Sequence, residues 1–203
     1  METRFLYYPI ILVELLLLSF LVYSLWPKPE VVVLDGEEYV VKKYKGTVAF
    51  VFTHLFIERN NFFYRIGNFR DFNLSDLETK DIVVCRGVSK ARNGLFCLNL
   101  TKVGHDDNYV LPSPRQVSPP LTQSEVGSYL SLSDQTLKDV EYFRDEDKNR
   151  TVVVLEFEGF VAFYLYEDIP FDPVAGTSYD VEGIVMDLRQ GLGLQVTKIT
   201  PSL

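Results

Sequence analysis

A β-hairpin pattern occurs twice in this chain, and the repeat restricts the fold more than any other sequence feature. The first copy covers residues 82–88 and 94–103, and the second covers 179–185 and 191–199. Each copy consists of two β-prone runs around a turn. An offset of 96 residues aligns the copies without a gap, and it matches Gly87 with Gly183, Leu98 with Leu194, Thr101 with Thr197 and Lys102 with Lys198. The repeat predicts two similar β modules.

Short β-prone runs precede each hairpin. They cover 30–35, 38–43, 47–57 and 62–66 before the first copy, and 129–132, 139–143, 151–157 and 160–166 before the second. Residues 104–122 hold four of the ten prolines, and such a stretch cannot sit inside a sheet. We therefore predict an all-β chain with a first module at 30–103, a Pro-rich linker at 104–123 and a second module at 124–203.

The N-terminal segment predicts the one helix of the chain. Residues 5–26 are apolar except for Glu14. As a helix they would reach roughly 33 Å, enough to cross a hydrocarbon core of about 30 Å. The run is longer than the apolar region of a signal peptide, about 7–15 residues. We expect residues 1–29 to form a membrane anchor and stalk, with 5–26 in contact with lipid. Glu14 would either contact another membrane protein or remain a protonated, tolerated carboxyl.

The anchor predicts a single-pass location in the cell membrane. The basic residues on the two sides of the span do not decide its orientation, and we expect the modules to lie on the extracytoplasmic side. Three sequons agree with that placement, and they make Asn73, Asn99 and Asn149 candidate glycosylation sites.

The second hairpin carries a resemblance to a known fold. Val181-Glu-Gly-Ile-Val185 followed by Leu194-Gln-Val-Thr-Lys-Ile199 resembles the closing strands of the OB fold, and 85–88 with 98–103 is a looser match. The resemblance implies two small Greek-key barrels, at roughly 38–103 and 124–203, that bind ligands on the face of strands 2 and 3. In the first module the candidate ligand-binding residues are Phe62, Phe63, Tyr64, Arg65, Arg70, Lys90 and Arg92. In the alternative interpretation the aromatic side chains fill the barrel and the arginines are solvated.

Charge separates the two modules. Residues 30–115 hold 12 basic and 11 acidic side chains, whereas residues 116–203 hold 6 and 15. Because a strongly acidic surface repels phosphate, we expect nucleic acid to be a partner of the first module only.

The sequence shows no arrangement of catalytic or metal-binding residues. His54 and His105 are not at ligand spacing, and two cysteines do not make a zinc site. No nucleotide-binding or nucleophile motif occurs. We expect no metal, no cofactor and no enzymatic activity.

Cys85 and Cys97 flank the first hairpin turn and are a candidate disulfide. The alternation of side chains along a strand places Cys85 inside the barrel. It places Cys97 outside, because Leu98 and Leu100 should turn inward. Only a β-bulge would bring the two sulfur atoms together, so the sequence leaves the pairing open.

Two functions agree with these features. The first is a membrane-anchored, non-enzymatic binding or scaffolding protein. The alternative is a nucleic-acid-binding OB-fold protein tethered at the cytoplasmic face of the membrane, with the first module as its binding part.

Overall fold

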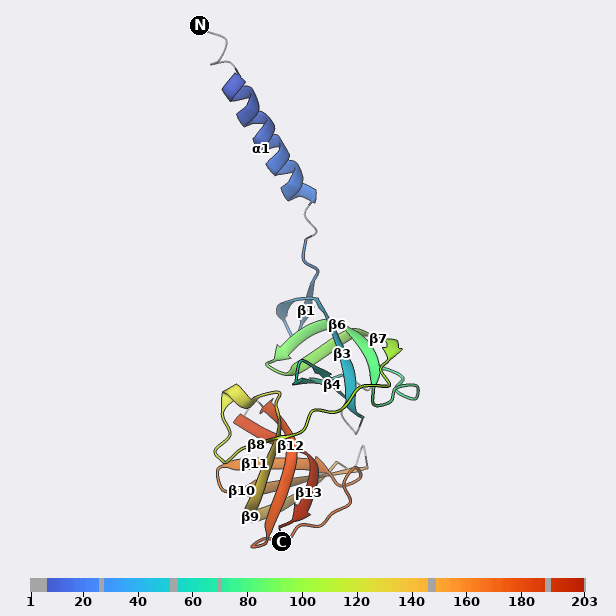
Figure 1. Ribbon diagram of the computed structural model, residues 1–203, viewed down its shortest axis with the longest axis vertical. Helices are drawn as coiled ribbons and strands as arrows, with labels where there is room; N and C mark the ends of the chain where they lie inside the picture. The colour runs from blue at the N-terminus through green and yellow to red at the C-terminus, as the bar shows by residue number, and fades with distance from the viewer. Residues whose placement is uncertain are drawn as a thin grey trace. The chain divides into compact units, whose positions relative to one another are not determined.

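The computed structural model describes residues 7–25, 28–51, 55–68, 71–145, 149–188 and 191–202. The chain divides into two units, with the boundary between Val41 and Lys42. The first unit holds the helix α1 (Tyr7–Leu25) and a hairpin of β1 (Val31–Leu34) and β2 (Glu37–Val40), and the second unit holds two barrels (Figure 1).

The α1 helix does not support the predicted membrane span. It has 19 residues, about 28 Å at 1.5 Å per residue, and residues 5, 6 and 26 of the predicted span lie outside the described residues. Glu14 is exposed near its middle. Among the described residues, no helix has the length and apolar character needed to cross a bilayer. The predicted single-pass location in the cell membrane is therefore wrong, and contacts with lipid or with a membrane protein through Glu14 are unsupported.

The first barrel closes in the order β3-β4-β5-β7-β6, with β6 paired back to β3. Its strands are β3 (Lys42–Val51), β4 (Leu55–Arg59), β5 (Phe62–Ile66), β6 (Asp81–Ala91) and β7 (Gly94–His105). Neighbouring strands are antiparallel except β5 and β7, which run parallel. This is the Greek-key arrangement of the OB fold, so the predicted barrel is confirmed.

The second barrel repeats the same order. Its strands are β9 (Tyr129–Asp145), β10 (Arg150–Phe157), β11 (Phe160–Leu165), β12 (Ser178–Leu188) and β13 (Gly191–Pro201). They pair as β10-β11-β13-β12-β9, and a further β9–β10 pairing completes the ring. A two-residue strand of the linker, β8 (Arg115–Gln116), pairs parallel with β9. The runs predicted at 129–132 and 139–143 are parts of one long strand.

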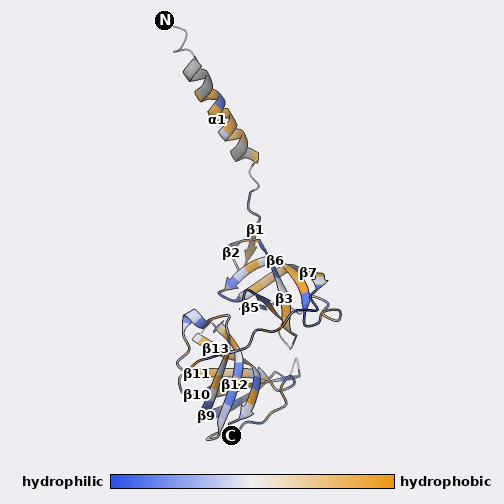
Figure 2. Cartoon of the chain, in the orientation of Figure 1, coloured by the Kyte–Doolittle hydropathy of each residue, from blue (hydrophilic) through white to orange (hydrophobic). Residues whose placement is uncertain are grey.

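Hydrophilic and hydrophobic residues both occur along the strands of the two barrels (Figure 2). Successive side chains of a strand point to opposite faces, so one set of side chains fills the interior of each barrel. Val48, Ile66 and Val83 are among the fully buried residues inside the first barrel, as are Leu132, Leu155 and Val181 inside the second.

The two aligned glycines, Gly87 and Gly183, sit at equivalent β-bulges. The register shifts between Arg86 and Gly87 in the first barrel, and between Glu182 and Gly183 in the second. A Cβ atom on Gly87 would lie 2.1 Å from the Phe96 carbonyl oxygen, and one on Gly183 would lie 2.4 Å from that of Gln195. The repeat therefore preserves glycine because the partner strand comes too close for any side chain.

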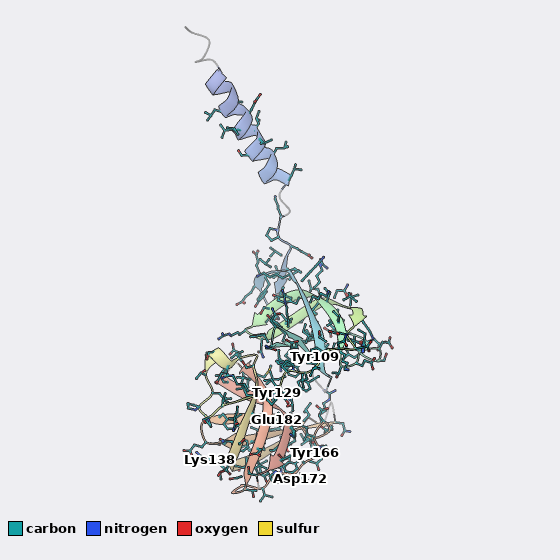
Figure 3. All side chains as sticks on the ribbon, in the orientation of Figure 1. Tyr109, Tyr129, Lys138, Tyr166, Asp172 and Glu182 are labelled. Carbon is teal, nitrogen blue, oxygen red and sulfur yellow. A yellow bond between two sulfur atoms is a disulfide. The ribbon has the colours of Figure 1, made fainter. Side chains whose placement is uncertain are left out.

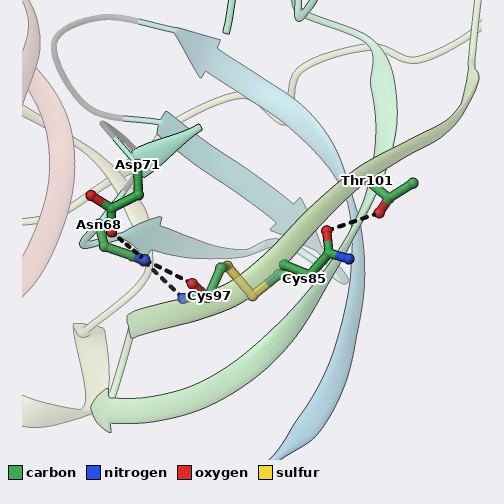
Figure 4. Close-up of a disulfide and its surroundings, with 6 residues drawn as sticks. Asn68, Asp71, Cys85, Cys97 and Thr101 are labelled. Atoms are coloured by element: carbon green, nitrogen blue, oxygen red, sulfur yellow. Dashed lines mark hydrogen bonds between the residues drawn. A yellow bond between two sulfur atoms is a disulfide. The ribbon is translucent and has the colours of Figure 1, made fainter. Parts of the chain in front are cut away.

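The bulge at Gly87 also brings the cysteines together. Arg86 pairs with Asn99 and Gly87 with Cys97, so Leu98 is the extra residue. The predicted orientations were wrong: Cys97 turns inward and is buried, whereas Leu98, expected inside, is 37% exposed. Cys85 and Cys97 form a disulfide inside the first barrel (Figure 4). The Asn68 side chain holds the strand beside it, because its amide donates to the Cys97 carbonyl and its oxygen accepts from the Cys97 N–H.

Candidate functional site

The face of strands 2 and 3 in the first barrel, formed by β4 and β5, is covered by the second barrel. Phe56 and Phe63 point outward from this face, and both are fully buried. They pack in an apolar cluster whose buried members are Ala49, Phe56, Phe63, Tyr129, Ile184 and Met186, hereafter the inter-barrel cluster. The Phe63 ring lies 5.8 Å from the Tyr129 ring. Phe63, a candidate for ligand stacking, therefore contacts the second barrel.

The other aromatic candidates lie at the barrel edge. The Phe62 ring packs over Gly127, where an added Cβ would lie 2.4 Å from a ring carbon, and the Phe63 N–H donates to the Gly127 carbonyl. Tyr64 is half-buried, with its ring 4.6 Å from that of Phe62 and 6.0 Å from that of Tyr44. Neither aromatic ring stands free on the surface.

The basic candidates are scattered. Arg65 is half-buried, and its burial lowers the pKa of the guanidinium. Arg92 donates to the backbone carbonyl of Gln123, at the end of the linker. Lys90 lies 4.9 Å from the centre of the Phe96 ring. Arg70 lies outside the described residues. The structure does not gather Arg65, Lys90 and Arg92, the three basic candidates that it describes, into one site.

Asn93, at the tip of the first hairpin, joins the barrels and was not expected from the sequence. It is completely buried, and its amide donates to the Val185 carbonyl at 3.0 Å. The backbone carbonyl of Asn93 accepts from the backbone N–H of Arg65. The repeat does carry a signal for a contact between the barrels. The second hairpin has Met186 and Leu188 at the positions of Lys90 and Arg92 in the first. Both apolar residues pack in the inter-barrel cluster.

A basic groove lies on another part of the first barrel. Its cations are Lys43 and Lys45 of β3 and Arg59 at the end of β4, all exposed. Gly46, Thr47 and Asn60 supply polar surface between them, and the volume is about 410 Å³. Glu58 also lines it, and its carboxylate accepts from the Asn61 N–H. Among the described residues, no carboxylate forms an ion pair with any of the three cations. We call this site the cationic groove.

The barrel boundaries strengthen the charge contrast seen in the sequence. Residues 42–105, from the start of β3 to the end of β7, contain 11 Lys and Arg and five Asp and Glu. Six of the 11 acidic residues in 30–115 lie outside the barrel, at 30–38 and at 106–107. The first barrel is therefore strongly basic.

The second barrel is acidic on its equivalent face. Asp139, Glu141 and Glu156 surround a shallow hollow beside Val154 and Val161. Glu156 lies directly opposite Asp139 across the β9–β10 pair. Elsewhere on this barrel Tyr166 donates to Asp172, and Tyr129 donates to Glu182 (Figure 3). The face formed by Asp139, Glu141 and Glu156 would repel phosphate.

Asp81 is the centre of a buried ion cluster at the base of the first hairpin. It is fully buried, with His105 Nδ1 at 2.6 Å from one oxygen and Lys102 Nζ at 2.7 Å from the other. Burial alone would raise the pKa of Asp81, but the hydrogen bonds from His105, Lys102 and the Glu78 N–H outweigh it and lower the pKa to about 2. This group could not be predicted from spacing in the sequence, because Asp81 and His105 are 24 residues apart. They become register partners only when β6 and β7 pair.

The same cluster contains a possible metal-ligand set. One donor atom each from Glu78, Asp81 and His105 lies within 4.8 Å of the others. However, both oxygens of Asp81 already accept hydrogen bonds from cationic or cation-forming groups, and a metal ion would have to approach the Lys102 ammonium. The arrangement suits an ion-paired structural cluster better than a metal centre.

We expect Asp81→Asn to lower the free energy of unfolding by roughly 1–3 kcal/mol at neutral pH, because charge-assisted hydrogen bonds to a buried carboxylate are lost. A carboxyl whose folded pKa is depressed stabilises the fold above its unfolded pKa, and the contribution is lost as the pH falls through the folded value. The difference from wild type should shrink between about pH 4 and pH 2. Thermal unfolding of wild type and Asp81→Asn across this pH range tests the prediction. Asp76→Asn is the exposed control, and an equal effect of both variants would contradict the assignment.

The three sequon asparagines are all exposed. The side-chain oxygen of Asn73 accepts from Ser75, that of Asn99 from Thr101 and that of Asn149 from Arg144. Their glycosylation stays a prediction.

Comparison with known proteins found distant structural similarity only. No family model and no curated protein matches the chain. A structure described as the p204 HINb domain has 12% sequence identity and a TM-score of 0.37, covering 83% of this chain and 99% of that one. A murine DNA binding protein bound with double-stranded DNA has 12% identity and a TM-score of 0.31, covering 87% of this chain and 99% of its own. At these values the similarity assigns neither a family nor a function.

Proposed function

We propose that this chain binds nucleic acid through the cationic groove of the first barrel. The supporting observation is the exposed set of Lys43, Lys45 and Arg59 around a groove of about 410 Å³. Lys and Arg side chains that neutralise phosphates supply most of the sequence-independent affinity of nucleic-acid binders. The basic balance of residues 42–105 would attract a polyanion to this barrel, and the acidic second barrel would orient it away from β9–β11.

The mode of binding differs from the one implied by the OB-fold resemblance. There, bases stack on aromatic side chains of strands 2 and 3. In this chain Phe56 and Phe63 of that face are occupied by the second barrel. We therefore propose backbone recognition in the cationic groove, with little dependence on base sequence.

We further propose a binding role rather than a catalytic one. The most strongly perturbed carboxyl among the described residues is Asp81, and both of its oxygens are engaged by His105 and Lys102. A carboxylate held in this way favours structural stabilisation over proton transfer.

The groove is tested with the full chain and fluorescein-labelled oligonucleotides in an anisotropy titration. We expect the double variant Lys45→Glu and Arg59→Glu to weaken binding at least about tenfold, because two phosphate contacts become repulsive. Lys138→Glu, an exposed charge change on β9 of the second barrel, is the matched control. Equal losses in the double variant and the control would reject the groove as the binding site.

A further inference from the structure

A second pocket lies where the two barrels and the linker meet. It has a volume of about 390 Å³, within the usual range for small-molecule sites of about 300–1,000 Å³. Asn61 and Phe63 come from the first barrel, Ser113 and Arg115 from the linker, and Ser128 and Tyr129 from the start of the second barrel. We call it the junction pocket. It exists only because both barrels are docked.

The lining suits a flat, polar, aromatic ligand. Pro112 and Tyr129 provide apolar surface, whereas Phe63 also lines the pocket but is fully buried. The Asn61 amide offers both hydrogen-bond donors and an acceptor. Ser113 and Ser128 add hydroxyl groups. The Arg115 guanidinium reaches Glu125 only at 3.5 Å, so it retains donors for an anionic group. A nucleobase with its adjoining phosphate has this combination of a flat apolar face, a polar edge and a negative charge.

The junction pocket adjoins the cationic groove. Asn60 lines the groove and Asn61 lines the pocket, and the two are consecutive residues of the β4–β5 turn. Both have left-handed backbone conformations, with φ of 56° and 61°. Two such residues form the tight turn that twisted antiparallel strands favour, and asparagine accepts this conformation more readily than most residues. The groove and the pocket therefore share the β4–β5 turn.

The pocket is held in shape by a contact between the barrels and by contacts within the second module. The buried Asn93 amide binds the Val185 carbonyl, and the Gly127 N–H donates to the same oxygen. The hydroxyl of Tyr129 donates to Glu182, which also pairs with Lys198 at 2.9 Å. A pocket fixed in this way loses little conformational freedom on binding.

We infer that the ligand is single-stranded nucleic acid, with its backbone in the cationic groove and one nucleobase in the junction pocket. This inference rests on the proposed function of the groove. A duplex keeps its bases paired and stacked, so it would engage the groove but would not place a base in the pocket without an unstacking cost. The chain should prefer single strands to duplexes of the same length.

The test is a pocket-filling variant of the full chain, Ser113→Trp, compared with Ser118→Trp in the same linker. We expect wild type and Ser118→Trp to bind a single strand about tenfold more tightly than the matching duplex, the size of one base contact. Ser113→Trp should lose this preference while its duplex affinity stays unchanged. Circular dichroism and thermal unfolding of both variants establish that they are folded.

The outcomes separate this inference from the proposed function. If Ser113→Trp keeps the single-strand preference while the Lys45→Glu and Arg59→Glu variant loses binding, the junction pocket is rejected and the groove stands. If wild type shows no preference for single strands, the pocket is rejected as well. If wild type binds neither oligonucleotide at low salt, both proposals fail.

Discussion

Replacing both Cys85 and Cys97 with alanine should lower the free energy of unfolding by about 3 kcal/mol. The disulfide closes a loop of 12 residues, and a crosslink of that length restricts the unfolded chain by roughly this amount. Both cysteines are also buried, so the substitution removes packed atoms from the barrel interior. For a unit of this size the melting temperature should fall by about 10 °C.

Thermal unfolding of the full chain measures the effect, and wild type in excess reductant provides the matched control. The reduced wild type should melt close to the alanine variant. An unchanged melting temperature in both would contradict a stabilising disulfide. The second barrel has Val181 and Gly193 at the aligned positions, so reduction should act on the first barrel alone.

The substitution Gly87→Ala should be at least as damaging, with a loss of about 3 kcal/mol or more. The new methyl group would lie 2.1 Å from the Phe96 carbonyl oxygen and 2.8 Å from Cys97 Cα, and both are backbone atoms that cannot rotate away. Steric overpacking usually costs about 1–3 kcal/mol, and more where the backbone must move. The bulge that aligns the disulfide would also be disturbed.

Gly104→Ala, in the same hairpin, is the matched control, because its nearest neighbour would be a flexible Ile82 methyl carbon at 3.8 Å. Gly183→Ala should reproduce the damage in the second barrel, where the Gln195 carbonyl lies 2.4 Å from the added carbon. Urea unfolding of the three variants compares them. Similar stability of Gly87→Ala and Gly104→Ala would contradict the close-approach explanation.

Local pattern was sufficient to predict most of the fold. Strand runs such as 62–66 and 151–157 match β5 and β10 within one residue. The aligned hairpins correctly indicated two related barrels. The bulges could not be predicted, because a bulge depends on how two strands pair and the sequence of one strand does not contain that information. For this reason the inward turn of Cys97 was missed.

The candidate site was harder to predict, because it depends on contacts between barrels. The aromatic segment 62–64 does carry the expected OB-fold face, but a second barrel covers Phe63. A single sequence cannot distinguish an aromatic side chain that stacks on a ligand from one that packs against another domain. The cationic groove was missed because Lys43, Lys45 and Arg59 come from two strands and form a group only when β3 and β4 pair. The predicted membrane span was wrong, because no helix among the described residues has the length and apolar character needed to cross a bilayer.

The affinity of the full chain for a labelled single strand of about 20 nucleotides, measured between about 50 and about 200 mM KCl, tests the central claim most directly. Three phosphate contacts, to Lys43, Lys45 and Arg59, predict a slope of about −2 in a plot of log affinity against log salt concentration. The Lys45→Glu and Arg59→Glu variant should lose most of that slope, and Lys138→Glu should retain it. Affinity that does not change with salt, or a slope that the double variant leaves intact, would contradict binding in the cationic groove.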